Sequence, residues 1–125
     1  MFMTLMDQLQ MKPLSVSKET IIYNMPVNAA TTQPFGYLHG GATAALAETV
    51  ASLGALQHIK ENEIIFGLEL NINHLKAVNT GSVTATALPI HIGRTSHVWD
   101  VRVVDESNNL IAVSRCTMAV KAKRP

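Results

Sequence analysis

Cysteine is nearly absent from this chain of 125 residues, which contains only Cys116. A single cysteine cannot form a disulfide within the chain. The first ten residues, MFMTLMDQLQ, also lack the basic stretch and the long apolar stretch of a secretory signal. These absences favour a cytoplasmic protein.

Charge of either sign is sparse, because charged residues make up 15% of the chain and the formal net charge is +1. The ten Lys and Arg are scattered, apart from the tail Lys121, Lys123 and Arg124, and form no basic stripe of the kind that binds nucleic acid. The five histidines show no metal-ligand spacing such as HExxH. We therefore expect neither a nucleic-acid partner nor a metal site.

Aromatic residues are few (5%) although hydrophobic residues reach 47%, so the apolar content is mostly aliphatic. The length suits one compact domain, predicted over residues 1–125. The mean hydropathy of +0.17 indicates that part of the apolar surface faces another subunit, which predicts a homo-oligomer. The longest apolar run, residues 40–56, carries Glu48 and several small polar residues, so it predicts a buried helix rather than a membrane span.

The first third of the chain predicts a helix, a strand and a loop. Leu5 and Leu9 lie at rough helical spacing before Pro13, which indicates a short helix over residues 3–11. Residues 16–27 are typical of a strand, and the Asn-, Thr-, Pro- and Gly-rich segment that follows is typical of a loop. That loop leads into an Ala- and Leu-rich helix over residues 41–57.

The remainder predicts strands joined by short turns. Their ranges are 64–75, 82–92, 96–105 and 110–120, separated by VNTG, GRT and ESNN. This order predicts an α+β protein in which an antiparallel sheet wraps around one long central helix, the hotdog fold. Trp99 and Cys116 are expected to pack inside, with the thiol unreactive, and His97 to be hydrogen-bonded locally.

Glu48 is the only formally charged residue between Gly40 and Gln57. Burying an unpaired carboxylate in so apolar a helix costs several kcal/mol or raises its pKa. Glu48 is therefore the first candidate for chemistry.

The predicted helix begins just after His39 with two glycines, Gly40 and Gly41. Its unpaired N–H groups carry a partial positive charge that can polarise a carbonyl, and glycine lets a substrate approach the backbone closely. The alternative is that the glycine pair only eases the turn. Gln33 and His39 flank this turn and can hydrogen-bond to a thioester or a water, although each taken alone is more often a loop-stabilising residue.

Helix geometry separates the two candidate groups. Glu48 lies eight residues after Gly40, which is ~12 Å along a helix. One chain cannot bring both to the same atom, so if Glu48 attacks a group held at Gly40 it must come from a second copy, and a monomer should then be inactive. Ser52, at i+4 from Glu48, shares its helix face and could hold the carboxylate or a water, or be a plain helix serine.

The segments QPFGYLHGG and AALAETVAS resemble the central motif of the hotdog-fold acyl-CoA thioesterases. The resemblance runs from about Val16 to Val120 and includes GLELNINHLK, PIHIG and SRCTMAV. It is strongest to the branch of glutamate-type 4-hydroxybenzoyl-CoA thioesterases, phenylacetate-pathway (PaaI-like) thioesterases and the 1,4-dihydroxy-2-naphthoyl-CoA hydrolases of menaquinone synthesis. It implies hydrolysis of an acyl-CoA, with an aromatic acyl group favoured, no cofactor beyond the CoA of the substrate, and a homotetramer assembled from dimers with shared sites.

The same resemblance implies a role for each candidate. Glu48 would be nucleophile or general base, with Ser52 assisting the water, while Gln33, His39 and the Gly40 amide of the neighbouring subunit would hold the carbonyl. The implied CoA-binding residues are Gly67, His74 and Lys76 on one wall and His91, Gly93, Arg94, Thr95 and Ser96 on the other. The family's turn reads Gly-Ser-Arg-His, so the cation here has moved by one position. Arg94 is equally compatible with a solvated hairpin charge.

Two other functions fit the same fold. A non-catalytic acyl-CoA-binding sensor needs no glutamate in the helix and is usually joined to a DNA-binding segment, which this sequence does not contain. A dehydratase acting on acyl-carrier-protein substrates would pair an earlier histidine with an acidic residue in a different helix context. Thioester hydrolysis is the favoured hypothesis because Glu48 is present.

Overall fold

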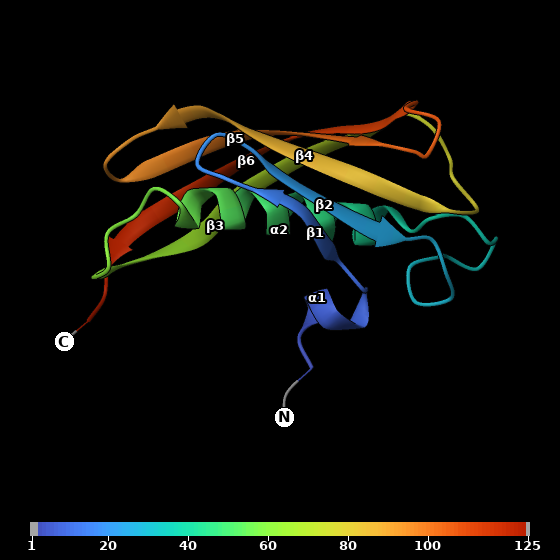
Figure 1. Ribbon diagram of the computed structural model, residues 1–125, viewed down its shortest axis with the longest axis horizontal. Coiled ribbons are helices and arrows are strands. Elements are labelled where there is room, and N and C mark those ends of the chain that lie inside the picture. The colour runs from blue at the N-terminus through green and yellow to red at the C-terminus, as the bar shows by residue number, and fades with distance from the viewer. Residues whose placement is uncertain (1–2, 125) are drawn as a thin grey trace.

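The computed structural model describes residues 3–124; residues 1, 2 and 125, which fall within the predicted domain span, lie outside the described part. Two helices and six strands follow one another along the chain (Figure 1). They are α1 (Leu5–Gln8), β1 (Lys12–Val16), β2 (Ile21–Pro26), α2 (Gly40–Leu56), β3 (Glu63–His74), β4 (Ser82–Ile92), β5 (Ser96–Val104) and β6 (Leu110–Ala122).

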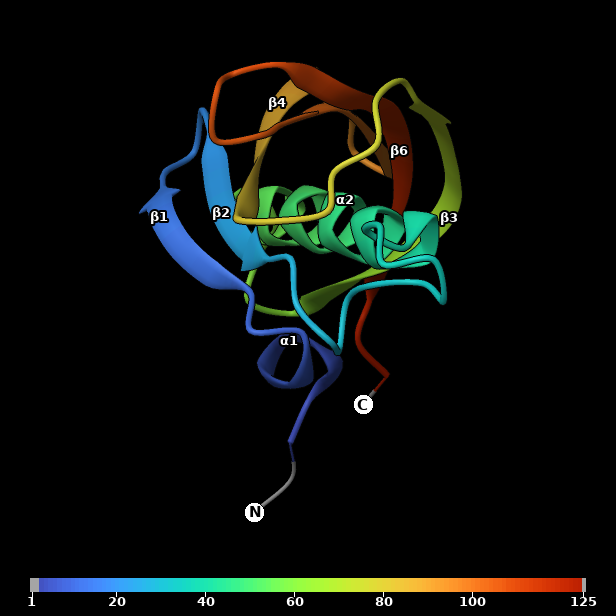
Figure 2. The ribbon, with the colours of Figure 1, turned by 90° about the vertical axis from the view of Figure 1, so that its right-hand side faces the viewer.

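The six strands form one antiparallel sheet in the order β1-β2-β4-β5-β6-β3. The sheet curves over α2, which runs along its concave side, while α1 lies on the far side of α2 from the sheet (Figures 1 and 2). The predicted fold class, an antiparallel sheet wrapped around a central helix, is confirmed. β3 forms an edge of this sheet, with β6 as its neighbour.

Small residues let α2 lie close to the sheet. Ala47, Ala51 and Gly54 are buried, and a Cβ at Gly54 would lie 2.7 Å from the Trp99 ring. Trp99 is fully buried, as predicted. No helix within residues 3–124 has the length and hydropathy needed to cross a bilayer.

Two predictions for the start of the chain were wrong in their bounds. The strand predicted over 16–27 is the shorter β2, and it pairs with an unpredicted strand, β1, in a hairpin closed where the Ser17 N–H donates to the Thr20 carbonyl at 3.0 Å. Pro13 fits β1 because an edge strand tolerates a missing N–H. The predicted helix 3–11 is the shorter α1, which ends before Gln10, a residue with φ of 56°.

Candidate active site

The start of α2 leaves one backbone N–H free. The Gly41 N–H donates to Nδ1 of His39 at 2.8 Å, and the Ala42 N–H donates to the His39 carbonyl at 3.0 Å. Within residues 3–124 no acceptor takes the N–H of Gly40. Because Nδ1 of His39 accepts, the neutral imidazole carries its proton on Nε2, where it can donate outward.

The side chain of Gln33 lies beside this helix start. Its Oε1 accepts the Phe35 N–H, which leaves the amide Nε2 to donate elsewhere. Gln33 and Gly40 line a hollow of about 450 Å³, which we call the Gly40 hollow. Its lining residues are Gln33, Tyr37, Leu38, Gly40, Thr43, His74, Leu75, Lys76, Ala77, Val78 and Ile111.

Two of the predicted CoA-binding residues belong to the Gly40 hollow. His74, the last residue of β3, packs on the helix start, since a Cβ at Gly40 would lie 3.0 Å from its Nε2. The Lys76 ammonium lies 3.5 Å from Oδ2 of Asp105 and stays half exposed. Water screens the half-exposed ammonium from the carboxylate, so the attraction within this ion pair is weak and Lys76 can still contact an anion.

Glu48 lies elsewhere, at the middle of α2, and its side chain is exposed in the single chain. The cost of burying an unpaired carboxylate, which first drew attention to Glu48, therefore does not arise within one chain. A Cβ at Gly67 would lie 3.0 Å from Oε2 of Glu48, so the glycine makes room for the carboxylate against β3. Gly67 thus lies under Glu48 and does not line the Gly40 hollow. It was predicted to share a wall with His74 and Lys76, and the structure separates it from them. A β-bulge follows it, between Gly67 and Glu69.

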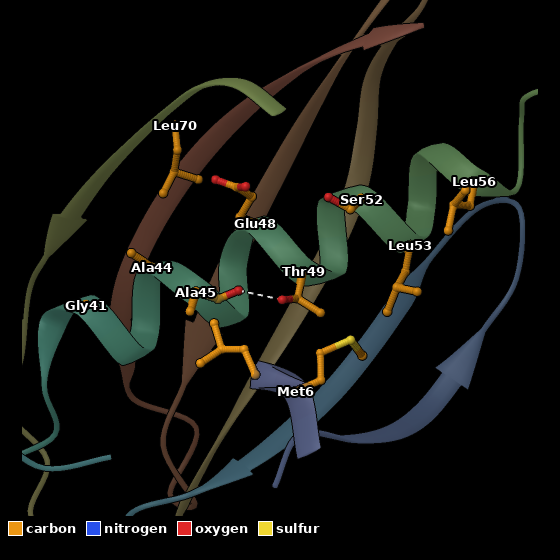
Figure 3. A pocket seen from close by; sticks show the side chains of 11 residues that line it. Met6, Gly41, Ala44, Ala45, Glu48, Thr49, Ser52, Leu53, Leu56 and Leu70 are labelled. Carbon is orange, nitrogen blue, oxygen red and sulfur yellow. Dashed lines mark hydrogen bonds between the residues drawn. The ribbon is translucent and has the colours of Figure 1, made fainter. Parts of the chain in front are cut away.

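Glu48 opens onto a second, largely apolar hollow of about 570 Å³, which we call the α1 groove (Figure 3). Its lining residues are Leu5, Met6, Gly41, Ala44, Ala45, Glu48, Thr49, Ser52, Leu53, Leu56 and Leu70. Ser52 shares this face with Glu48, as the i+4 spacing predicts. The Ser52 hydroxyl lies 3.7 Å from the Met118 sulfur, a weak acceptor, so it can bond to a ligand or a water.

Glu48 and the Gly40 amide therefore serve different hollows of one chain. Gln33 and Gly40 line the Gly40 hollow, whereas Glu48 and Ser52 line the α1 groove. This matches the separation predicted from the rise of the helix. The predicted constellation is thus divided, and His39 lines neither of these hollows but a smaller one that it shares with Gly41 and Leu5.

The second predicted CoA wall lies at the opposite end of the molecule from the Gly40 hollow, at the β4–β5 turn (Figure 1). Gly93 closes this turn by donating to the Ser96 carbonyl at 2.8 Å, and the Thr95 carbonyl accepts the Val120 N–H at 2.9 Å. His91 packs on Gly93, and Arg94 is exposed, with no ion pair among the described residues. A single chain does not bring the two walls together.

Cys116 is fully buried. Burial, followed by the nearby negative charges of Glu48 and Glu69, raises the pKa of the thiol to about 12. It stays protonated at neutral pH, which agrees with the predicted unreactive thiol. Among residues 3–124 no three His, Cys, Asp or Glu side chains are placed to hold a metal ion.

His97 is also buried, but its Nδ1 has no partner among the described residues. The prediction of local hydrogen bonding was wrong for this nitrogen. Burial lowers the pKa of His97, and the charges of His58 and His91 lower it further, while Glu63 opposes them. His97 lines neither hollow and belongs to the packing at the C-terminal end of α2, where its ring lies 6.2 Å from that of His58.

Sequence reasoning assigned no chemistry to the first residues, yet Leu5 and Met6 line the α1 groove beside Glu48. The sequence signal for α1 is the pair Thr4 and Asp7, which form a capping box. It marks where a helix starts, but not what the helix covers.

Comparison with known proteins identifies the family. Residues 35–112 match the Thioesterase superfamily. A 1,4-dihydroxy-2-naphthoyl-CoA hydrolase of Listeria monocytogenes serotype 1/2a (strain 10403S) is 47% identical over 122 residues, covering 98% of this chain and 99% of the relative. The solved structure of a thioesterase from Haemophilus influenzae superposes with a TM-score of 0.92 at 40% identity, covering 95% of this chain and 83% of that chain.

A Staphylococcus aureus thioesterase is similar over its full length. A structure with one glutamate replaced by alanine superposes with a TM-score of 0.93 at 42% identity, covering 95% of this chain and 99% of that chain. Another structure of the same protein has a glutamine replaced by alanine, with a TM-score of 0.91, 42% identity and coverage of 94% and 98%. The two replaced positions are fifteen residues apart, as are Gln33 and Glu48.

Proposed function

Because the chain belongs to the thioesterase superfamily, we propose that it hydrolyses acyl-CoA thioesters at a site shared by two copies of the chain. In this site the carbonyl oxygen of the substrate accepts the free N–H of Gly40, with Gln33 Nε2 and His39 Nε2 as further donors. The second chain supplies Glu48. The observation that carries the proposal is that Gly40 and Gln33 line one hollow of the chain and Glu48 lines another.

The donors at the start of α2 stabilise the charge that develops on the oxygen as the thioester carbon becomes tetrahedral. The Glu48 carboxylate attacks that carbon directly or takes a proton from an attacking water. Direct attack forms a mixed anhydride as CoA thiolate leaves, and water then cleaves the anhydride. Both routes release the acid and CoA, and in both the Ser52 hydroxyl holds the water.

The edge strand β3 supports the shared site. Phe66 and Leu68 are 53% and 62% exposed, and Gly67 between them contacts Glu48. An edge strand with apolar side chains is a template for pairing with another chain. Pairing of β3 with β3 of a second copy would place the partner beside Glu48 by two-fold symmetry. Assembly of such dimers into a tetramer remains a prediction.

The proposed substrate carries an aromatic acyl group, such as 1,4-dihydroxy-2-naphthoyl-CoA. Two observations support it: the hydrolase of that name in Listeria monocytogenes is 47% identical, and the α1 groove is lined mainly by aliphatic side chains. For the CoA portion we propose contacts with His74 and Lys76 and with the turn His91, Gly93, Arg94, Thr95 and Ser96 of the partner.

The test is a hydrolysis screen across aromatic, short-chain and long-chain acyl-CoAs, comparing kcat/KM for the unaltered protein and Glu48→Gln. We expect kcat to fall by about 10²–10⁴ in the variant, with substrate binding retained. The control is Glu61→Gln, because Glu61 is an exposed carboxylate that lies outside β3 and lines neither hollow. Near-normal turnover of Glu48→Gln would rule out the mechanism. Hydrolysis of aliphatic acyl-CoAs alone would rule out the aromatic substrate and leave the reaction intact, whereas binding without turnover by the unaltered protein would favour a sensor.

A further inference from the structure

The helix α1 forms one side of the α1 groove, which Glu48 also lines. Leu5 and Met6 come from α1, and Leu70 comes from β3 on the other side of α2 (Figure 3). The Met6 side chain extends along α2 toward Leu53, with its sulfur at the leading end (Figure 3). The groove therefore has a wall supplied by the first residues of the chain.

This wall is fastened to the rest of the molecule. The Thr4 hydroxyl accepts the Asp7 N–H at 3.2 Å, and Asp7 Oδ2 accepts the Thr4 N–H at 3.1 Å, which caps α1. Gln10 Oε1 then accepts a bond from the Asn28 side chain at 2.8 Å, and Met11 is buried in the core. These attachments fix where Met6 lies relative to α2.

The groove becomes apolar away from the carboxylate. The Thr49 hydroxyl donates to the Ala45 carbonyl at 2.7 Å, so its proton is not available to a ligand. Glu48 and Ser52 are the polar groups that remain free in the groove. Met6, Leu53 and Leu56 line the part of the groove nearer the C-terminal end of α2. Leu56 lies eight residues after Glu48, which is ~12 Å along the helix. Beyond Ser52, a group attached to a carbonyl beside Glu48 and lying in this direction meets the apolar side chains of Met6, Leu53 and Leu56.

We propose that α1 is the wall that limits the size of the acyl group, and that Met6 is the specificity-determining residue on it. The inference rests on the proposed function, since it assigns the acyl portion of the substrate to the α1 groove. Methionine suits this position because its unbranched side chain adapts to ligands of different outline. The predicted ligands are ring systems that fill the space between Met6 and Leu53.

The experiment changes the size of residue 6 in both directions. Met6→Ala enlarges the groove and Met6→Phe narrows it, and each is assayed with benzoyl-CoA and the larger 2-naphthoyl-CoA. We expect the ratio of kcat/KM for the larger over the smaller thioester to rise about ten-fold in Met6→Ala and to fall about ten-fold in Met6→Phe. Met3→Ala is the control, because Met3 is 66% exposed and lines neither hollow.

A purely structural role for Met6 would change kcat/KM for both thioesters by the same factor, and that result would overturn the inference. Thermal unfolding followed by circular dichroism shows whether each variant is folded. Calorimetric binding of the same two thioesters gives the size ratio without turnover. Absence of hydrolysis in the unaltered protein would therefore contradict the proposed function, while the binding ratio would still decide the role of Met6.

Discussion

The Gly40 hollow and the α1 groove lie along the same helix but are built from different groups. The Gly40 hollow offers donors: a free backbone N–H, the Gln33 amide and the Lys76 ammonium. The α1 groove offers one carboxylate and the Ser52 hydroxyl, since the Thr49 hydroxyl donates to the Ala45 carbonyl, and its other side chains are apolar. The first can hold a developing negative charge, and the second can attack or activate water beside an apolar group.

Under the proposed mechanism, neither hollow is sufficient for hydrolysis. Donors alone polarise a carbonyl without a nucleophile, and a carboxylate alone has nothing to hold the oxygen that becomes charged. Within one chain the two sets line separate hollows, so the proposed site is complete only with a second copy. The strongest tests therefore separate the two hollows genetically.

The largest expected effect is recovery of activity in a mixture of two inactive variants. Gln33→Ala damages the Gly40 hollow and Glu48→Gln damages the α1 groove. When the two are refolded together in equal amounts, mixed dimers contain one intact site, and activity should return to about a quarter of the unaltered level. Mixing Glu48→Gln with the double variant Gln33→Ala, Glu48→Gln is the control and should recover nothing. If the first mixture also stays inactive, each site lies within one chain.

An intermediate effect is expected from Gly67→Ala, which acts on the α1 groove alone. The new Cβ would lie 3.0 Å from Oε2 of Glu48 and displace the carboxylate, so kcat should fall about ten- to a hundred-fold. Steady-state kinetics measures this. In the Glu48→Gln background the same substitution should have no further effect, because it acts through Glu48. An equal loss in that background would show that Gly67 acts by another route.

The smallest effect concerns the C-terminal end of α2, outside both hollows, and it should appear in stability and not in turnover. The pKa of His97 is lowered from 6.5 in the folded state, so the unfolded chain binds more protons in the window just below pH 6.5. The free energy of unfolding should be unaffected by His97 above that pH and decrease as the pH falls below it. His58, His91 and Glu63 are the titratable groups that act on His97.

Urea unfolding at pH 7.5 and pH 5.5 measures this change. His97→Phe should reduce the difference in free energy of unfolding between pH 7.5 and pH 5.5. His74→Gln, which alters an exposed histidine of the Gly40 hollow, is the control and should leave that difference unchanged. An undiminished difference in His97→Phe would assign the pH dependence to other groups.

Most of the fold was predictable because its signals are local. The helix predicted over 41–57 is α2, and the later strands match their predicted ranges within two residues, since short turns such as GRT mark where each strand ends. The hairpin of β1 and β2 was missed because Pro13 and the polar residues 17–20 hide two short strands. Local patterns also could not show that β3 lies beside β6, because that pairing joins residues far apart in the sequence.

The site was predictable in its residues more than in its arrangement. The position of Glu48 in an apolar helix and the rise of that helix already placed it apart from Gly40. The sequence did not show that Gly67 makes room for the carboxylate or that Met6 lines the same groove, because both arrangements bring separate elements together. The sequence also did not show that Glu48 is exposed in one chain, beside the edge strand β3.

The pairing of β3 with β6 affects how the chain folds while it is being synthesised. Chains emerge from the ribosome with the N-terminus first, and long-range strand pairing is slow. Gly67 faces Met118 across the two strands, so β3 has no neighbour until the segment that begins at Leu110 has been synthesised. During synthesis, β3 therefore stays unpaired and exposed to other nascent chains until β6 of its own chain has been translated.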